Sequence, residues 1–190
     1  MFALAVPVIV ATVFALARGG SMSGWSQQPV RWWQLAIVAL AIQIPLYSAP
    51  LGDWVPITAF GPLATVLTTT LVLAMLLRNA SGPTRPACLI AASGVALNLI
   101  VIVMNGGWMP RADELAPRPF AREALTSTIN NTAPRGPETR LVWLGDIIAQ
   151  PAWVPLANVV SPGDVLLSLG AAYWAFVSTR RGQTTLQVTP

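Results

Sequence analysis

The sequence predicts an all-α fold, an integral membrane bundle of about five transmembrane helices with one or two short interfacial helices in a long external loop. Of the 190 residues, 54% are hydrophobic and 9% are charged, whereas about a quarter of an ordinary soluble domain is charged. The apolar residues gather in five stretches, and connections without acidic residues alternate with connections that carry them. A chain of this length normally forms one domain, so we treat residues 1–190 as a single transmembrane domain.

Each apolar stretch reaches or approaches the length that a membrane-spanning helix needs, about 20 residues. The expected helices cover residues 2–17, 32–51, 54–77, 87–104 and 162–179, which leaves residues 105–161 as the external loop. The stretch 54–77 is the clearest, because it holds no charged side chain and ends at Arg78. The first stretch has its arginines after it, whereas a cleaved signal peptide has basic residues before its apolar core, so we expect a retained helix.

The charged residues predict the orientation of the bundle, because cytoplasmic loops are enriched in basic residues. The first loop, the third loop and the C-terminal tail carry arginines without any acid: Arg18, Arg31, Arg78, Arg85, Arg180 and Arg181. All seven acidic residues fall in or beside the second and fourth connections. The N-terminus is therefore expected outside and the C-terminus in the cytoplasm. Several tryptophans, including Trp32 and Trp33, fall at predicted helix ends, where indole rings favour the membrane interface.

The residue types that are missing exclude several functions. Histidine is absent, which excludes histidine general-base chemistry, a histidine-held haem and imidazole-ligated zinc or copper. Cys88 is the only cysteine, so no intrachain disulfide or iron–sulfur cluster can form, and we interpret it as a small buried hydrophobic residue. We expect no cofactor, no metal and no nucleic-acid partner, since no basic run exists to bind phosphates. The expected partners are the lipid bilayer and other membrane-protein subunits.

Two short motifs flank the external loop, Asn105–Pro110 after the fourth helix and Ser161–Asp164 at the start of the fifth. The first interpretation is that they cap helices, with glycine and proline ending one helix and Ser161 beginning the other. The alternative is a polar pocket open to the outside. Its candidate ligand-binding residues are Asn98, Asn105, Asp146, Asn158 and Asp164. For Asn98 alone, an interhelical hydrogen bond is the simpler explanation.

The external loop contains seven prolines before Pro162, which argues against one continuous helix. Phe120–Ile129 is expected to form a short helix. Leu141–Ile148 is expected to form another, because its apolar residues recur at helical spacing. The second segment is too short to cross a membrane, so we expect it to lie at the outer interface or to dip partway into it.

The motifs also carry a resemblance to a known family. Asn-Gly-Gly-x-Met-Pro at Asn105–Pro110, Leu-Gly-Asp-Ile-Ile at Leu144–Ile148 and Ser-x-Gly-Asp at Ser161–Asp164 resemble an uncharacterised bacterial polytopic membrane-protein family known only as a domain of unknown function. The resemblance covers most of the chain. It implies a small helical fold in the bacterial cell (inner) membrane, and it implies no activity.

Three functions remain open. A non-enzymatic accessory subunit or scaffold of a larger membrane complex comes first, because the sequence has no catalytic motif and no internal repeat. Small residues such as Ala91 and Gly94 would permit close contacts between its helices. The second is binding or transport of a small molecule, ion or lipid through the outward-facing pocket. The third is a membrane enzyme that uses Asp146 and Asp164 as an acid–base pair.

Overall fold

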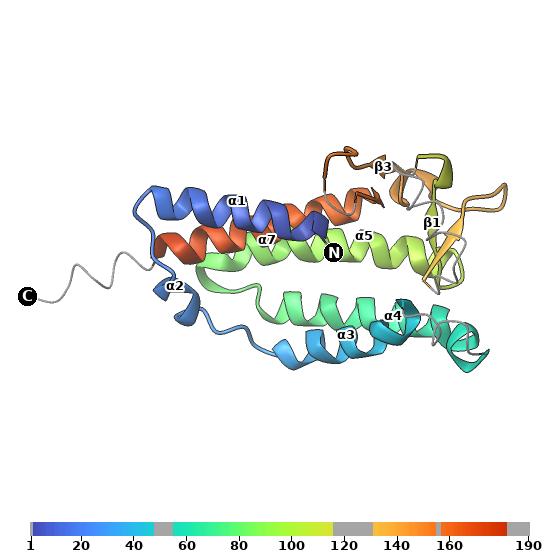
Figure 1. Cartoon of the computed structure of the whole chain (residues 1–190). Helices are drawn as coiled ribbons and strands as arrows, with labels where there is room; N and C mark the ends of the chain where they lie inside the picture. The colour runs from blue at the N-terminus through green and yellow to red at the C-terminus, as the bar shows by residue number, and fades with distance from the viewer. Residues whose placement is uncertain (1, 48–54, 116–130, 155–156, 182–190) are drawn as a thin grey trace, which may run out of the picture.

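The computed structural model describes residues 2–47, 55–115, 131–154 and 157–181, and it is mostly helical (Figure 1). Long helices lie side by side and alternate in direction, while the short strands gather beyond one end of them, the strand end. We call the opposite end the arginine end, because it holds Arg18, Arg31, Arg78, Arg85, Arg180 and Arg181. The helix expected over Phe120–Ile129 lies outside the described residues.

The five expected helices correspond to long helices of the structure. They are α1 (Phe2–Ala17), α3 (Trp33–Tyr47), α4 (Val55–Arg78), α5 (Arg85–Met104) and α7 (Pro162–Arg181). The short helix α2 (Ser23–Ser26) and the 3-10 turn η2 (Gly82–Thr84) lie in the connections at the arginine end. Residues 48–51 of the second expected helix lie outside the described residues. Apolar stretches therefore predicted the helices well, because helix hydrogen bonds join residues close in sequence.

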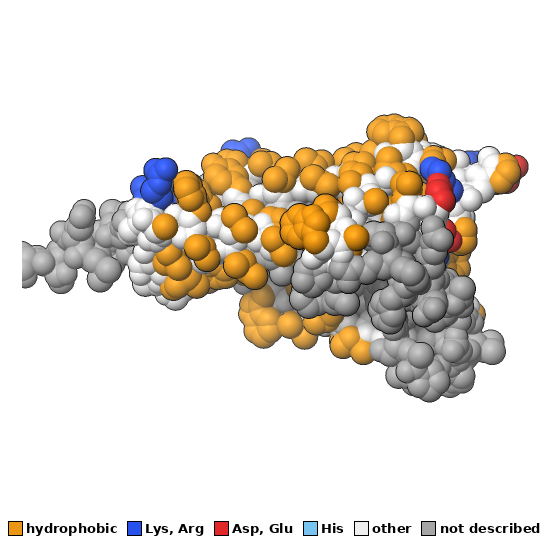
Figure 2. Space-filling view, turned by 45° about the horizontal axis from the view of Figure 1, so that its top comes forward, with side chains coloured by type: hydrophobic (Ala, Val, Ile, Leu, Met, Phe, Trp, Pro, Cys, Tyr) orange, Lys and Arg blue, Asp and Glu red, His pale blue; other side chains and the backbone are white. Residues whose placement is uncertain are grey.

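Two segments of the described chain are long and apolar enough to cross a membrane, Ala59–Arg78 in α4 and Gly82–Met104 in η2 and α5. Val6–Ala17 and Trp33–Leu46 are apolar but shorter. By length and composition, the helices thus support two candidate spans and not the expected five. The two spans also differ in burial, which is 50% for the α5 span and 17% for the α4 span. Figure 2 shows hydrophobic side chains spread along the visible face of the bundle, between charged groups at its two ends.

The helices pack in the order α1, α7, α5, α4 and α3, and the most extensive contact joins α5 to α7. At this contact the two backbones touch. A Cβ atom added to Gly94 would lie 2.3 Å from the Gly163 carbonyl oxygen, and one added to Gly170 would lie 2.4 Å from the Ala91 nitrogen. The small residues that the sequence singled out, Ala91 and Gly94, lie at this crossing. Their role is to permit an approach that any larger side chain would prevent.

The segment expected as the external loop, residues 105–161, contains short strands in its described part, so the all-α prediction is wrong for this part of the chain. The strands are β1 (Met109–Arg111), β2 (Thr132–Pro134), β3 (Ile148–Ala149) and β4 (Val159–Val160). β1 pairs with β2 in parallel, with Met109 opposite Thr132, and β3 pairs with β4 in antiparallel. We call described residues 105–115, 131–154 and 157–160 the strand cap. Met109 and Leu144 of the cap pack against Val101 and Ile102 of α5, which fixes the cap to the bundle.

The helix expected over Leu141–Ile148 is also wrong. This segment makes only the 3-10 turn η4 (Val142–Leu144) and then continues as extended chain into β3. The backbone of Asp146 is bound to β1 and the residue after it. Its N–H donates to the Pro110 carbonyl (2.8 Å), and its carbonyl accepts from the Ala112 N–H (2.9 Å). The backbone N–H and C=O groups that a helix would use therefore form hydrogen bonds with a distant segment instead.

The α5–α7 contact predicts a large effect of one methyl group. Gly94→Ala is expected to lower the free energy of unfolding by about 1–3 kcal/mol, the usual cost of overpacking a core, because the new Cβ meets α7 backbone. Unfolding in detergent by heat or by SDS measures this effect. Gly136→Ala is the matched control, since a Cβ there meets nothing within 4 Å. Equal stability of the two variants would show that the helices are not in backbone contact.

Candidate functional site

The first turn of α7 is closed by a reciprocal capping box between Ser161 and Asp164. The Asp164 N–H donates to the Ser161 hydroxyl (2.9 Å), and the Ser161 N–H donates to Asp164 Oδ2 (3.1 Å). Each side chain satisfies a backbone N–H that has no partner within the helix, and the carboxylate lies at the positive end of the helix dipole. These hydrogen bonds agree with the helix-cap interpretation of the second motif.

Asn98 of α5 joins the capping box from the neighbouring helix. Its Nδ2 donates to Asp164 Oδ1 (2.9 Å), and its Oδ1 accepts from the Ser161 hydroxyl (2.8 Å). Asn98 and Ser161 are buried, so an unsatisfied polar atom in either side chain would be costly. A Cβ added to Gly163 would lie 2.0 Å from Asn98 Oδ1. Glycine at this position therefore leaves the space that the Asn98 amide occupies. We call Asn98, Ser161 and Asp164 the interhelical cluster.

Asp146 of the strand cap carries a buried carboxyl group. Neither salt bridge of the described residues includes it. Burial, and then the negative charge of Asp164, raises the pKa of Asp146 to about 8, although Arg111 opposes the shift. The buried Arg111 side chain donates instead to Asp113 Oδ1 through Nε (2.5 Å) and to the Thr132 hydroxyl through Nη1. Asp146 is therefore mostly protonated and neutral at pH 7.

Asn105 is not part of the interhelical cluster; it attaches the strand cap to the end of α5. Its Nδ2 donates to the carbonyl groups of Val101 (2.8 Å) and Arg140 (3.0 Å), and its Oδ1 accepts from the Arg140 N–H (2.9 Å). Gly106 and Gly107 follow with φ angles of 68° and 96°, the left-handed conformation that commonly ends a helix. The first motif thus also acts as a cap.

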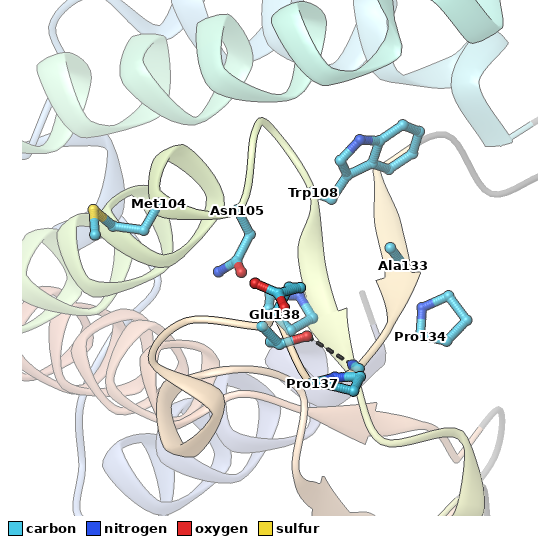
Figure 3. A pocket seen from close by; sticks show the side chains of 10 residues that line it. Met104, Asn105, Trp108, Ala133, Pro134, Pro137 and Glu138 are labelled. Carbon is cyan, nitrogen blue, oxygen red and sulfur yellow. Dashed lines mark hydrogen bonds between the residues drawn. The ribbon is translucent and has the colours of Figure 1, made fainter.

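An open groove of about 420 Å³ lies beside Asn105 on the strand cap (Figure 3). Trp108 and several prolines form much of its wall, and Glu138 brings a carboxylate close to Asn105. Its lining consists of Met104, Asn105, Trp108, Pro110, Ala133, Pro134, Gly136, Pro137, Glu138 and Thr139. Asn105 is the one candidate pocket residue that contributes to it. The groove is therefore separate from the interhelical cluster.

Asn158 lies on the surface of the strand cap, beside β4. Its N–H donates to Gln150 Oε1 (3.0 Å), and its Oδ1 accepts from the Val159 N–H (2.8 Å). The structure thus brings Asn98 and Asp164 into direct contact and puts Asp146 within electrostatic range of Asp164. Asn105 and Asn158 form hydrogen bonds elsewhere.

Arg111 is a member of this region that the sequence does not single out. An arginine in a loop resembles an ordinary solvated charge. The one sequence feature that points to a bound arginine here is Asp113, a possible partner two residues later. Its burial depends on pairing between β1, β2 and Asp146, because Arg111 is opposite Pro134 on one side and bridges Asp146 on the other. Cys88, in contrast, is buried in α5 as expected.

Comparison with known protein families gives a match that covers most of the chain. Residues 27–176 match the model of a family described as a family of unknown function (DUF5317). No curated protein and no solved structure gives a match. The matched region extends from the end of α2 into α7, so it includes the strand cap and the interhelical cluster.

The raised pKa of Asp146 predicts a pH-dependent stability. The folded chain keeps this proton up to about pH 8, whereas the unfolded chain releases it near the ordinary value of 3.8. The folded state therefore binds more protons between these pH values, and its stability falls as the pH rises through them. Asp146→Asn stays neutral, so it is expected to match the wild type near pH 3, where the wild-type carboxyl is protonated in both states, and to unfold several degrees higher at pH 8.5.

Thermal unfolding in detergent at both pH values measures this difference. Glu138→Gln is the matched control, because Glu138 is an exposed carboxylate of the same strand cap. A pH dependence that is the same in wild type and Asp146→Asn would rule out Asp146 as its source.

Proposed function

The chain belongs to the DUF5317 family, whose function is unknown, and from the arrangement of its own residues we propose that it is a multi-pass protein of the bacterial inner membrane. In this proposal α1, α3, α4, α5 and α7 all cross the bilayer, in keeping with their alternating directions (Figure 1). The N-terminus is outside and the C-terminus is cytoplasmic. The support is the arginine end, which has six arginines and no acid among the described residues, as expected of a cytoplasmic face.

The observation that carries this proposal is the exposure of α4. A helix in the core of a soluble protein can be as apolar as α4, but such a helix is mostly buried, whereas 17% of the α4 span is buried. Phe60 and Leu63 are 63% and 65% exposed. Contact of this much apolar surface with water is unfavourable. Lipid acyl chains around α4 remove that contact.

Within the membrane, we propose that the chain is a non-enzymatic accessory subunit or scaffold of a larger membrane complex. The support is that the interhelical cluster is fully used in holding helices together. Both Asp164 carboxylate oxygens accept hydrogen bonds, one from Asn98 and one from Ser161. Both oxygens are thus engaged in structural hydrogen bonds, which gives less support to an enzyme that uses Asp146 and Asp164 as an acid–base pair.

The strand cap carries the surface that we propose contacts a partner subunit. Trp143 and Trp153 are 65% and 81% exposed there. Tryptophan is enriched at protein interfaces and often dominates the binding energy, because it buries a large apolar area while its N–H finds a partner. Two such side chains exposed on a small cap are consistent with a docking role.

A second candidate function is binding or transport of a small molecule, ion or lipid through an outward-facing pocket. Asp146 favours it, because a buried carboxyl group with a pKa of about 8 near a second carboxylate is an arrangement common at functional sites. The pocket would use Asp146 with Asn98 and Asp164, and the groove beside Asn105 would be a second, separate binding surface.

The topology can be tested with reporter fusions. A reporter fused after Gly20 is expected to read cytoplasmic, and one fused after Pro117 is expected to read external, because the first point lies in a connection with arginines and no acid, whereas in the second connection acids balance the arginines. Paired alkaline phosphatase and fluorescent-protein fusions make the measurement. The reverse reading at either point would overturn the proposed orientation.

The accessory-subunit proposal predicts a partner. Purification of the full chain in mild detergent is expected to recover a second membrane protein in stoichiometric amount, quantified by mass spectrometry. The double variant Trp143→Ala/Trp153→Ala is expected to lower that recovery about tenfold or more, as loss of a major interface residue does. Trp33→Ala is the matched control, an exposed tryptophan at the other end. A chain that purifies alone would contradict the proposal and favour the second candidate.

A further inference from the structure

We propose that Arg31, Trp32 and Arg78 form a binding site for the phosphate group of an anionic phospholipid. The three residues lie at the arginine end, where the chain enters α3 and where α4 finishes. The inference rests on the membrane location proposed above, because a lipid headgroup reaches this site only if α3 and α4 lie in a bilayer. It adds a specific lipid contact that the accessory-subunit role does not require.

Asn79 builds the site by binding the chain before α3 to the end of α4. The Arg31 N–H donates to Asn79 Oδ1 (2.7 Å), and Asn79 Nδ2 donates to the Arg31 carbonyl (2.7 Å). The same Nδ2 also donates to the Met75 carbonyl (2.7 Å). The Asn79 side-chain amide therefore holds both the N–H and the carbonyl group of Arg31. The Arg31 guanidinium is not part of this attachment and stays available to a ligand.

Trp32 holds a backbone conformation that large side chains rarely adopt. Its φ angle is 60°, in the left-handed region that favours glycine. In this conformation the indole ring lies next to the Arg78 guanidinium, whose central carbon is 5.7 Å from the ring centroid. Strained residues of this kind persist where the surrounding structure holds them, and they cluster at ligand-binding sites. Here the strain brings an aromatic ring and a cation together at the surface.

The charge of the site is not neutralised within the described chain. Arg31 and Arg78 are exposed, and both salt bridges of the described residues lie in the strand cap. The described acidic residues are likewise all at the strand end or at the start of α7. α3 begins at Trp33, so the positive end of its helix dipole faces the same region. The site therefore attracts an anion.

The neighbouring apolar groups indicate a lipid and not a free anion. Trp32 and Trp33 are 52% and 55% exposed, and indole rings favour the layer where headgroups meet acyl chains. Guanidinium groups bind phosphate oxygens through paired, charge-assisted hydrogen bonds. A phospholipid presents a phosphate and an apolar body at this same depth. An anionic headgroup adds attraction to the two arginines.

Lipid titration of the detergent-solubilised full chain tests the proposal, with bound lipid counted by native mass spectrometry. Phosphatidylglycerol is expected to bind about tenfold more tightly than phosphatidylcholine, since several basic side chains act on one anionic headgroup. Arg31→Gln and Arg78→Gln are each expected to weaken phosphatidylglycerol binding about fivefold, the contribution of one basic side chain near an anionic surface. Trp32→Gly is expected to weaken it too while the chain stays folded, because glycine accepts the φ angle.

Arg140→Gln is the matched control, because it removes an exposed arginine at the opposite end, and it is expected to leave lipid affinity unchanged. Equal affinity for the two lipids would overturn the proposal, as would an equal loss in Arg140→Gln. Displacement of phosphatidylglycerol by the same concentration of inorganic phosphate would also overturn it, since the site would then bind free anions. Failure of the membrane proposal would look different, because alkaline carbonate would then release the chain from membranes.

Discussion

The contact between α5 and α7 is the interaction on which the rest of the structure depends. Gly94 and Gly163 bring the two backbones together, and the Asn98 amide then reaches both side chains of the capping box that begins α7. Close approach and hydrogen bonding support each other, since the amide reaches α7 only where the backbones are close and its hydrogen bonds then hold the two helices together. α1 packs on α7 and α4 packs on α5, so this one contact joins the two halves of the bundle.

The strand cap is attached to the α5–α7 pair at two points, the end of α5 and the start of α7. Asn105 ties its first part to the end of α5, and Ser161 ends it at the start of α7. Between these attachments, Asp146 binds β1 through its backbone and carries a neutral carboxyl group at pH 7. A cap anchored in this way moves with the helices and can present its exposed tryptophans in a fixed position. That arrangement suits a subunit that acts by contact.

The two ends of the molecule differ in their electrostatics. At the strand end, Arg111 and Arg135 are paired with acidic residues. At the arginine end, Arg31 and Arg78 have no carboxylate partner in the described chain, and aromatic rings take the neighbouring positions. The alternation of acid-free and acid-containing connections along the sequence is thus also a division in space, because the helices alternate in direction (Figure 1).

The sequence by itself determined the positions of the long helices, the two cap motifs and the division of charge, because these depend on residues close together in the chain. It predicted that Leu141–Ile148 would be helical, since spacing alone does not reveal that β1 binds the Asp146 backbone. It also proposed five pocket residues without deciding which of them meet. Only the tertiary structure brought Asn98 to Asp164, which lies 66 positions away, because that meeting depends on how closely two glycine-bearing helices can pack.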